Sequence, residues 1–226
     1  MRPLEAGLRA GLDALALDLT AAQVGQLLDY LALIQKWNKV YNLTALRDPG
    51  LMLTHHLLDS LAVIVPLRRV LTGLPRPSPD PRAGAFRLLD VGAGAGLPGV
   101  VIAICCPEVA VTCVDAVAKK AAFVQQVAVT LKLANLRGLH DRVELLAKRK
   151  EDGYDIVSSR AFASLEDFTR GSGAVLAADG AWLAMKGKLP DEEIAQLPPE
   201  VKVFHVEHLV VPALLAERCI VWMQKN

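Results

Sequence analysis

A glycine-rich segment near the middle of the chain, Asp90-Val91-Gly92-Ala93-Gly94-Ala95-Gly96-Leu97-Pro98-Gly99, constrains the fold more than any other feature. It follows a short apolar run at 88–91 and leads into a helical pattern at 98–106. A strand that turns through glycines into a helix is typical of the ligand-binding edge of a doubly wound α/β sheet. Glycine permits positive φ angles and lets the backbone approach a ligand closely. The segment therefore predicts an α/β domain that binds a ligand at this turn.

The pattern after Arg87 supports that prediction, because β-rich and helical runs alternate. We expect strands at 88–91, 109–114, 136–140, 154–159 and 181–185, and helices at 98–106, 118–133 and 164–177. Such alternation predicts a mostly parallel sheet with helices on both faces. Two further strands, at 201–211 and 218–223, follow one another closely and predict an antiparallel hairpin at one edge.

The first 71 residues are predicted to be helical. Thr20 and Gln23 match a capping box ahead of an apolar stripe with helical spacing. The turn signal Asp48-Pro49-Gly50 predicts a second helix at about 51–71. Four prolines then exclude a helix or a central strand at 72–86. We therefore expect an N-terminal helical extension (1–71), a Pro-rich linker (72–86) and a ligand-binding domain (87–226).

Composition narrows the class of protein. With 53% hydrophobic and 22% charged residues among 226, the chain is not intrinsically disordered. Its net charge of +1 means that binding to nucleic acid would need the basic residues gathered on one face. The sequence has neither a signal peptide nor an uncharged apolar run of membrane-spanning length. Four cysteines without zinc-ligand spacing fit buried, reduced thiols, so we expect a cytoplasmic protein with no membrane contact.

Two interpretations of the glycine segment compete. Residues 94–99 satisfy GxGxxG, the dinucleotide-binding pattern, which would make the protein an NAD-binding regulator or dehydrogenase. Residues 90–96 instead match a second pattern, in which an acidic residue precedes GxGxG. Pro98 removes an N–H from the first helical turn, which favours a smaller zwitterionic ligand whose amine Asp90 could hold. Asp115 ends the next strand, at the position where an acidic residue binds ribose hydroxyls under both interpretations. Alternatively, Asp115 has only a structural role, as the N-cap of the helix expected at 118–133.

Several separate motifs occur in a characteristic order, and together they resemble one family. They are Asn42-Leu43-Thr44, His56-Leu57-Leu58-Asp59-Ser60-Leu61, the glycine segment, Ser159-Arg160-Ala161-Phe162-Ala163-Ser164-Leu165 and Lys186-Gly187. Over about residues 20–225 the chain closely resembles the bacterial RsmG (GidB) family of 16S rRNA methyltransferases. The resemblance implies a Rossmann-like class I methyltransferase fold, with a seven-stranded, mostly parallel sheet.

The resemblance also implies the reaction and the cofactor. Members of the family use S-adenosyl-L-methionine to methylate N7 of guanine 527 in the 530 loop of 16S rRNA. The family's cofactor contacts fall on Gly92, Leu97, Val143, Glu144 and Arg160, and the ribose-binding acid of class I enzymes falls on Asp115. With Asp90 and Gly94 from the loop itself, these residues form the predicted cofactor site. The predicted partner is the small ribosomal subunit or its RNA, and we expect a monomer.

Guanine N7 carries no proton to remove, so methylation there needs no general base. Arg160 and Lys186 are therefore candidates to position the substrate, through rRNA phosphates or the guanine O6 edge. The structural alternatives are an ion pair for Arg160 and a solvated lysine for Lys186. His55, His56 and Asp59 are too few for a metal site, and no metal is expected. A class I methyltransferase acting on a small molecule or a protein remains an alternative.

Overall fold

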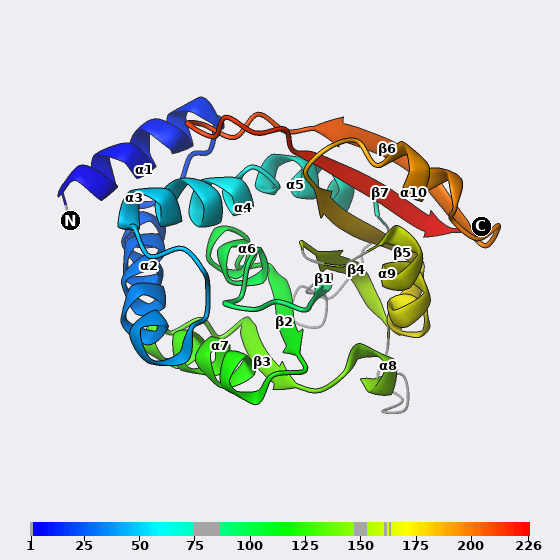
Figure 1. Cartoon of the computed structure of the whole chain (residues 1–226), viewed down its shortest axis with the longest axis horizontal. Helices are drawn as coiled ribbons and strands as arrows, with labels where there is room; N and C mark the ends of the chain where they lie inside the picture. Colours follow the sequence, from blue (N-terminus) through cyan, green and yellow to red (C-terminus); the bar gives the residue numbers. More distant parts are fainter. Residues whose placement is uncertain (1, 75–85, 147–152, 161, 163) are drawn as a thin grey trace.

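A twisted sheet is the centre of the computed structural model, which describes residues 2–74, 86–146, 153–160, 162 and 164–226 (Figure 1). Within these residues the strand order is β3-β2-β1-β4-β5-β7-β6, and only β7 runs in the direction opposite to the other strands. The strands are β1 (Phe86–Val91), β2 (Val109–Asp115), β3 (Leu136–His140), β4 (Tyr154–Ser159), β5 (Leu176–Lys186), β6 (Val201–His208) and β7 (Cys219–Lys225). The mostly parallel seven-stranded sheet and the antiparallel pairing of the last two strands are confirmed.

Helices fill both the N-terminal region and the connections between strands. They are α1 (Arg2–Ala14), α2 (Ala21–Tyr41), α3 (Pro49–Met52), the π-helical segment η1 (Leu53–Leu58), α4 (Asp59–Leu61), α5 (Ile64–Gly73), α6 (Gly99–Cys105), α7 (Ala118–Thr130), α8 (Val143–Leu146), α9 (Leu165–Ser172), the 3₁₀ segment η3 (Gly173–Val175) and α10 (Asp191–Ala195). The predicted capping box starts α2: Thr20 Oγ1 accepts from the Gln23 N–H at 3.2 Å, and Gln23 Oε1 accepts from the Thr20 N–H at 3.0 Å.

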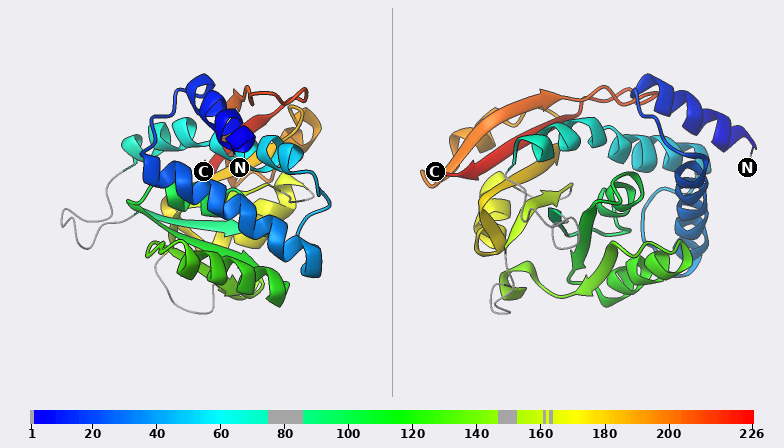
Figure 2. Two further views of the ribbon diagram at one scale, coloured as in Figure 1. Left: turned by 90° about the vertical axis from the view of Figure 1, so that its left-hand side faces the viewer. Right: turned by 180° about the vertical axis from the view of Figure 1, so that it is seen from behind.

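The sheet separates two hydrophobic layers, because successive residues of a strand point to opposite faces. Leu88 and Ile156 face α2, α5, α6 and α7, whereas Leu89 and Val157 face α8 and α9. Figure 2 shows the N-terminal helices gathered on the side of α6 and α7, with α9 on the opposite side. The N-terminal helices therefore form a layer over one face of the sheet.

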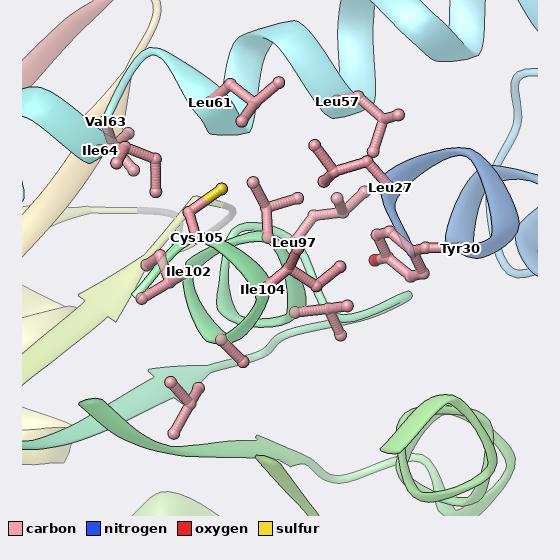
Figure 3. Close-up of a cluster of buried hydrophobic side chains, with 14 of the residues drawn as sticks. Leu27, Tyr30, Leu57, Leu61, Val63, Ile64, Leu97, Ile102, Ile104 and Cys105 are labelled. Carbon is pink, nitrogen blue, oxygen red and sulfur yellow. The ribbon is translucent and has the colours of Figure 1, made fainter. Parts of the chain in front are cut away.

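This layer and the sheet share one hydrophobic core. Figure 3 shows Leu27 and Tyr30 of α2, Leu57 of η1 and Leu61 of α4 converging on Leu97 and the helix α6. Each of the first four side chains has no exposed surface. Burial of this kind stabilises a fold by about 1.5–3 kcal/mol for each large aliphatic side chain. The division into 1–71, 72–86 and 87–226 stays a prediction, and residues 75–85 of the linker lie outside the described residues.

Three local features differ from the sequence prediction. The helix expected at 51–71 is divided, because η1 has π-helical hydrogen bonding and a turn separates α4 from α5. The helix expected at 164–177 ends at Ser172, and β5 begins at Leu176 rather than at 181. The early start of β5 accompanies a register shift in its pairing with β4, between Tyr154 and Ile156. Gly180 is close to this shift, and a Cβ added to it would come within 2.9 Å of the Tyr154 carbonyl oxygen. The short helices α8 and α10 were not predicted.

Among the described residues, Pro49–Gly73 is long and apolar enough to cross a membrane, but 72% of its most apolar window is buried inside the protein. That degree of burial is typical of a core helix, which agrees with its position in the hydrophobic layer. All four cysteines are buried and unpaired, as predicted.

Leu27→Ala tests whether the N-terminal helices and the sheet unfold together. Truncation should lower the free energy of unfolding by roughly 2–5 kcal/mol, because the site is fully enclosed. Urea denaturation followed by circular dichroism would measure the loss, with Leu215→Ala at a fully exposed position as the control. A separate early transition in Leu27→Ala, with the main transition unmoved, would contradict the shared core.

Candidate active site

The glycine segment between β1 and α6 has two sides with different surroundings. Gly92, Gly94 and Gly96 all have positive φ, at +67°, +61° and +88°. A Cβ added at Gly92 would have no neighbour within 4 Å, and one at Gly94 would meet only the Gly92 carbonyl at 4.0 Å. At Gly99, in contrast, an added Cβ would come within 2.9 Å of Asp90 Oδ2. The first half of the segment is thus open to a ligand, and its second half packs against the sheet.

Two carboxylates hold this loop from below. Asp115, at the end of β2, accepts hydrogen bonds from the N–H groups of Gly94 at 2.9 Å and Val117 at 2.8 Å. Asp90, at zero exposure, accepts from the Gly99 N–H and from Ser158 Oγ, both at 2.9 Å. Burial raises the pKa of Asp90 to about 6, although both hydrogen bonds act in the opposite direction. Asp115 is not the N-cap of α7, which is Val117.

A third contact comes from the N-terminal layer. The Tyr30 hydroxyl donates to the Ala95 carbonyl at 2.6 Å, and the side chain is completely buried. Burial raises the pKa of this phenol well above its usual value, so it remains a hydrogen-bond donor. The sequence analysis missed Tyr30, and its only signal was a polar tip within an apolar helical stripe.

A hollow of about 210 Å³, the loop-side hollow, lies beside the open half of the glycine segment. It is lined by Val91, Gly92, Val114, Asp115, Ala116, Asp141, Arg142, Val143, Glu144 and Phe162. Four of the predicted cofactor residues therefore meet here: Gly92, Asp115, Val143 and Glu144. Segments following β1, β2 and β3 supply the walls, as expected for the carboxyl edge of a parallel sheet.

The remaining predicted cofactor residues lie elsewhere. Gly94 is next to the hollow, with its N–H held by Asp115. Leu97 is 4% exposed and belongs to the core beneath α2. Asp90 is enclosed under the loop, where its two oxygens bond to protein groups. Arg160 lines a second hollow.

That second hollow, of about 390 Å³, is the cationic hollow. It is lined by His55, His56, Asp59, Arg160, Met185, Lys186, Gly187 and Arg218. Both predicted positioning residues have carboxylate partners: Arg160 Nη1 lies 3.2 Å from Asp59 Oδ2, and Lys186 Nζ lies 2.8 Å from Glu193 Oε2. Arg218 was missed by the sequence analysis, in which it was only the first residue of a predicted strand.

His56 is held in this hollow by the loop after α2. Its Nε2 lies 2.9 Å from Thr44 Oγ1, and Thr44 in turn donates its N–H to Asn38 Oδ1. Burial, followed by the nearby Arg160 guanidinium, lowers the pKa of His56 to about 4. Asn42 is the left-handed C-cap of α2, and the N-cap of the following helix α3 is Asp48, so neither Asn42 nor Thr44 caps that helix. The described residues contain no cluster of three or more potential metal ligands.

Residues that follow β4 line both hollows. Arg160 lines the cationic hollow, and Phe162, two residues later, lines the loop-side hollow. Since two residues span at most about 7 Å, the walls of the two hollows are close together here, and we call Arg160 and Phe162 the partition. Ala161 and Ala163 lie outside the described residues.

Two basic stretches of the sequence, 68–87 and 142–150, are described by the structure only in part. Arg142 lines the loop-side hollow, whereas Lys148, Arg149 and Lys150 lie outside the described residues, as do Arg76 and Arg82. Arg68 donates to the Cys105 carbonyl at 2.7 Å, and Arg69 pairs with Glu207. Arg87 lies over the Tyr154 ring near the opposite end of the strands.

Solved structures with the same fold define the class. Over 77% of this chain and 53% of the other, the structure matches TrmN from Thermus thermophilus with a TM-score of 0.54 at 19% identity. A TehB-like SAM-dependent methyltransferase from Corynebacterium glutamicum matches over 88% and 99% with a TM-score of 0.51 at 14% identity. These similarities, with the strand order described above, define a Rossmann-like class I methyltransferase fold.

Sequence comparison then gives the family. The model of GidB, rRNA small subunit methyltransferase G, matches residues 23–221. The chain is 67% identical over 226 residues to ribosomal RNA small subunit methyltransferase G of Albidiferax ferrireducens, covering 100% of this chain and 99% of that one. It is 65% identical over 224 residues to the protein of that name from Polaromonas sp., with coverage of 99% and 95%. The chain belongs to the GidB family, which favours the methyltransferase interpretation of the glycine segment over the dinucleotide one.

Asp90→Asn should reveal the buried carboxyl through the pH dependence of stability. Because the folded pKa is raised from 3.8 to about 6, the native state binds the extra proton between these pH values, and its stability falls as pH rises. The variant lacks this titration. The free energy of unfolding of the wild type minus that of the variant should therefore fall by up to about 3 kcal/mol between pH 3.5 and 6.5. Urea titrations across this range measure it, and a constant or rising difference would contradict the assignment.

Proposed function

We propose that this protein transfers the methyl group of S-adenosyl-L-methionine to N7 of guanine 527 in 16S rRNA, within the 530 loop of the small ribosomal subunit. The names of the family model and of the relatives support a methyltransferase for small-subunit rRNA. The observation that carries the proposal is the pair of neighbouring hollows, one under the glycine loop and one rich in cationic side chains. This arrangement suits a methyl donor on one side and a polyanionic acceptor on the other.

The loop-side hollow fits the cofactor. Gly92 and Gly94 leave open backbone where a Cβ would otherwise stand, so a ligand can approach the main chain closely. Asp115 could accept from ribose hydroxyls while it holds the loop, and Glu144 and the backbone near Val143 could bind the adenine. Leu97 and Asp90 support the loop from the side of the core, and Arg160, which lines the cationic hollow, would meet the cofactor only at the partition. When bound, S-adenosylmethionine supplies a sulfonium methyl group that a nitrogen lone pair can attack.

The cationic hollow fits an acceptor that needs no proton removed. Guanine N7 presents a free lone pair, so the enzyme has to align N7 with the methyl group and exclude water. His56, with its pKa of about 4, is neutral at pH 7 and need not act as a base. Arg160 and Lys186 would bind rRNA phosphates or the guanine O6 edge. On this proposal the protein works in the cytoplasm, as a monomer and without a metal.

Transfer of labelled methyl groups tests the proposal directly. Small ribosomal subunits and 16S rRNA from a strain that lacks the gene would be incubated with the protein and radiolabelled S-adenosylmethionine. Label should enter the 530 loop at one guanine, and N7 modification can be mapped by chain cleavage at the methylated position. Subunits from the parent strain are the control and should accept no label. Label at another nucleotide, or none at all, would refute the proposal.

Gly94→Asp should abolish cofactor binding and leave the fold largely intact. The new side chain would stand in the open half of the loop at positive φ, and its charge would lie close to Asp115. Calorimetry with S-adenosylhomocysteine should show at least a roughly hundredfold loss of affinity, since a like charge and a blocked cradle each weaken binding. Gly73→Asp, at an exposed glycine with no neighbour within 4 Å, is the matched control. Unchanged affinity in Gly94→Asp would show that the ligand lies elsewhere.

A further inference from the structure

Three segments far apart in the sequence meet at Asp59. This carboxylate, on the first residue of α4, is 3% exposed and uses a different oxygen for each of two arginines. Oδ1 accepts from Arg218 Nε at 2.7 Å, and Oδ2 accepts from Arg160 Nη1 at 3.2 Å. Arg160 follows β4 and Arg218 precedes β7, so one buried carboxylate fixes both guanidinium groups at the wall of the cationic hollow.

Both guanidinium groups keep donors for a ligand. Arg160 donates through Nη1, to Asp59 and to the His55 carbonyl at 3.1 Å. Arg218 donates through Nε to Asp59 and through Nη1 to the Glu217 carbonyl at 2.8 Å. Within the described residues, Nη2 of each arginine has no partner. The side chains are 27% and 24% exposed, and both line the hollow.

The charge balance of the hollow favours an anion. Arg160, Lys186 and Arg218 are opposed by Asp59 in the wall and by Glu193, which pairs with Lys186. Three cations against two carboxylates leave an excess of positive charge. His56 adds none at neutral pH because its pKa is about 4. A planar guanidinium with free N–H groups is suited to the paired oxygens of a phosphate or a carboxylate.

Sheet topology helps to decide whether that anion is a phosphate of the RNA or the carboxylate of the cofactor. The glycine loop follows β1, and β4 and β5 lie between β1 and β7 in the sheet. Because β7 is antiparallel, its first residue, Cys219, pairs with Lys186 at the carboxyl end of β5. Arg218 is therefore on the same edge of the sheet as the glycine loop but three strands away, about 14 Å at the usual strand spacing. Its backbone is therefore remote from the glycine loop, where the cofactor is proposed to bind.

We propose that Arg218 is a substrate-binding residue that contacts a backbone phosphodiester of the RNA beside the target guanine, and that Asp59 is the positioning residue that orients it. This inference rests on the proposed function. According to this inference, α4 contributes to RNA binding through the buried carboxylate of Asp59, which does not contact the RNA itself. The alternative source, the carboxylate of the cofactor's amino-acid end, would make Arg218 a cofactor ligand instead.

Arg218→Gln and Arg218→Lys test this, with Arg9→Gln as the matched control because Arg9 forms an exposed ion pair with Glu5 on α1. For Arg218→Gln, the KM for small subunits should rise roughly tenfold while kcat stays within about twofold, as expected for a lost charged contact. Direct binding to 16S rRNA at several salt concentrations should show a shallower slope of log K against log salt, by about 0.7–0.9. Arg218→Lys should keep the slope and recover part of the affinity.

Binding of S-adenosylhomocysteine separates the outcomes. An unchanged affinity in Arg218→Gln supports the phosphodiester, whereas a loss that matches the rise in KM would assign Arg218 to the cofactor and overturn the inference. An unchanged salt slope would also overturn it. In a double-mutant cycle, Asp59→Asn should raise KM by a smaller factor in the Arg218→Gln background than in the wild type, because the part of its effect that acts through Arg218 is already lost. If the wild type binds rRNA without methylating it, the proposed function fails while the salt slope still tests Arg218.

Discussion

The carboxylates of Asp90 and Asp115 hold the two ends of the glycine loop, and the shape of the loop-side hollow depends on those two hydrogen bonds. Asp115 bonds to the Gly94 N–H on the open side, and Asp90 bonds to the Gly99 N–H where α6 begins. A backbone with several positive φ angles is costly to order, so it needs such support from groups already fixed by the sheet. The parallel strands provide it, because β1 and β2 end side by side, at Val91 and Asp115, and so bring Asp90 and Asp115 under the loop.

The N-terminal layer stabilises the same loop from the other side. Tyr30 bonds to the Ala95 carbonyl, and Leu97 enters the core shared with α2. Farther along, Thr44 holds His56 and α4 supplies Asp59 to the cationic hollow. The described residues of this layer therefore contribute both to the support of the loop and to the second wall of the site. A change at Tyr30 should reach the site through the loop, whereas His56 and Asp59 line the cationic hollow themselves.

Most of the fold could be predicted from local patterns, because alternation of strands and helices and glycine turns are local properties of the sequence. Gly92, Asp115, Val143 and Glu144 also came together as expected, since they follow adjacent parallel strands. Tyr30 and Arg218 could not be predicted in this way. The role of Tyr30 depends on a contact with Ala95, 65 positions along the chain, and that of Arg218 on a contact with Asp59, 159 positions away. A tyrosine in an apolar stripe or an arginine before a strand carries no distinctive local signal. The early start of β5 was missed because its register shift depends on pairing with β4.

The neutral total charge of the chain is consistent with an RNA substrate once the distribution is considered. The carboxylates of Asp115, Asp141 and Glu144 line the loop-side hollow, and the guanidinium and ammonium groups of Arg160, Arg218 and Lys186 line the cationic hollow. A sulfonium donor is favoured by the first environment, and a polyanion by the second. Since Arg160 stands at the partition and shares Asp59 with Arg218, displacement of one guanidinium would alter the carboxylate that orients the other. Binding of RNA and binding of cofactor are therefore expected to be linked through this one buried carboxylate, and by linkage the effect must be reciprocal.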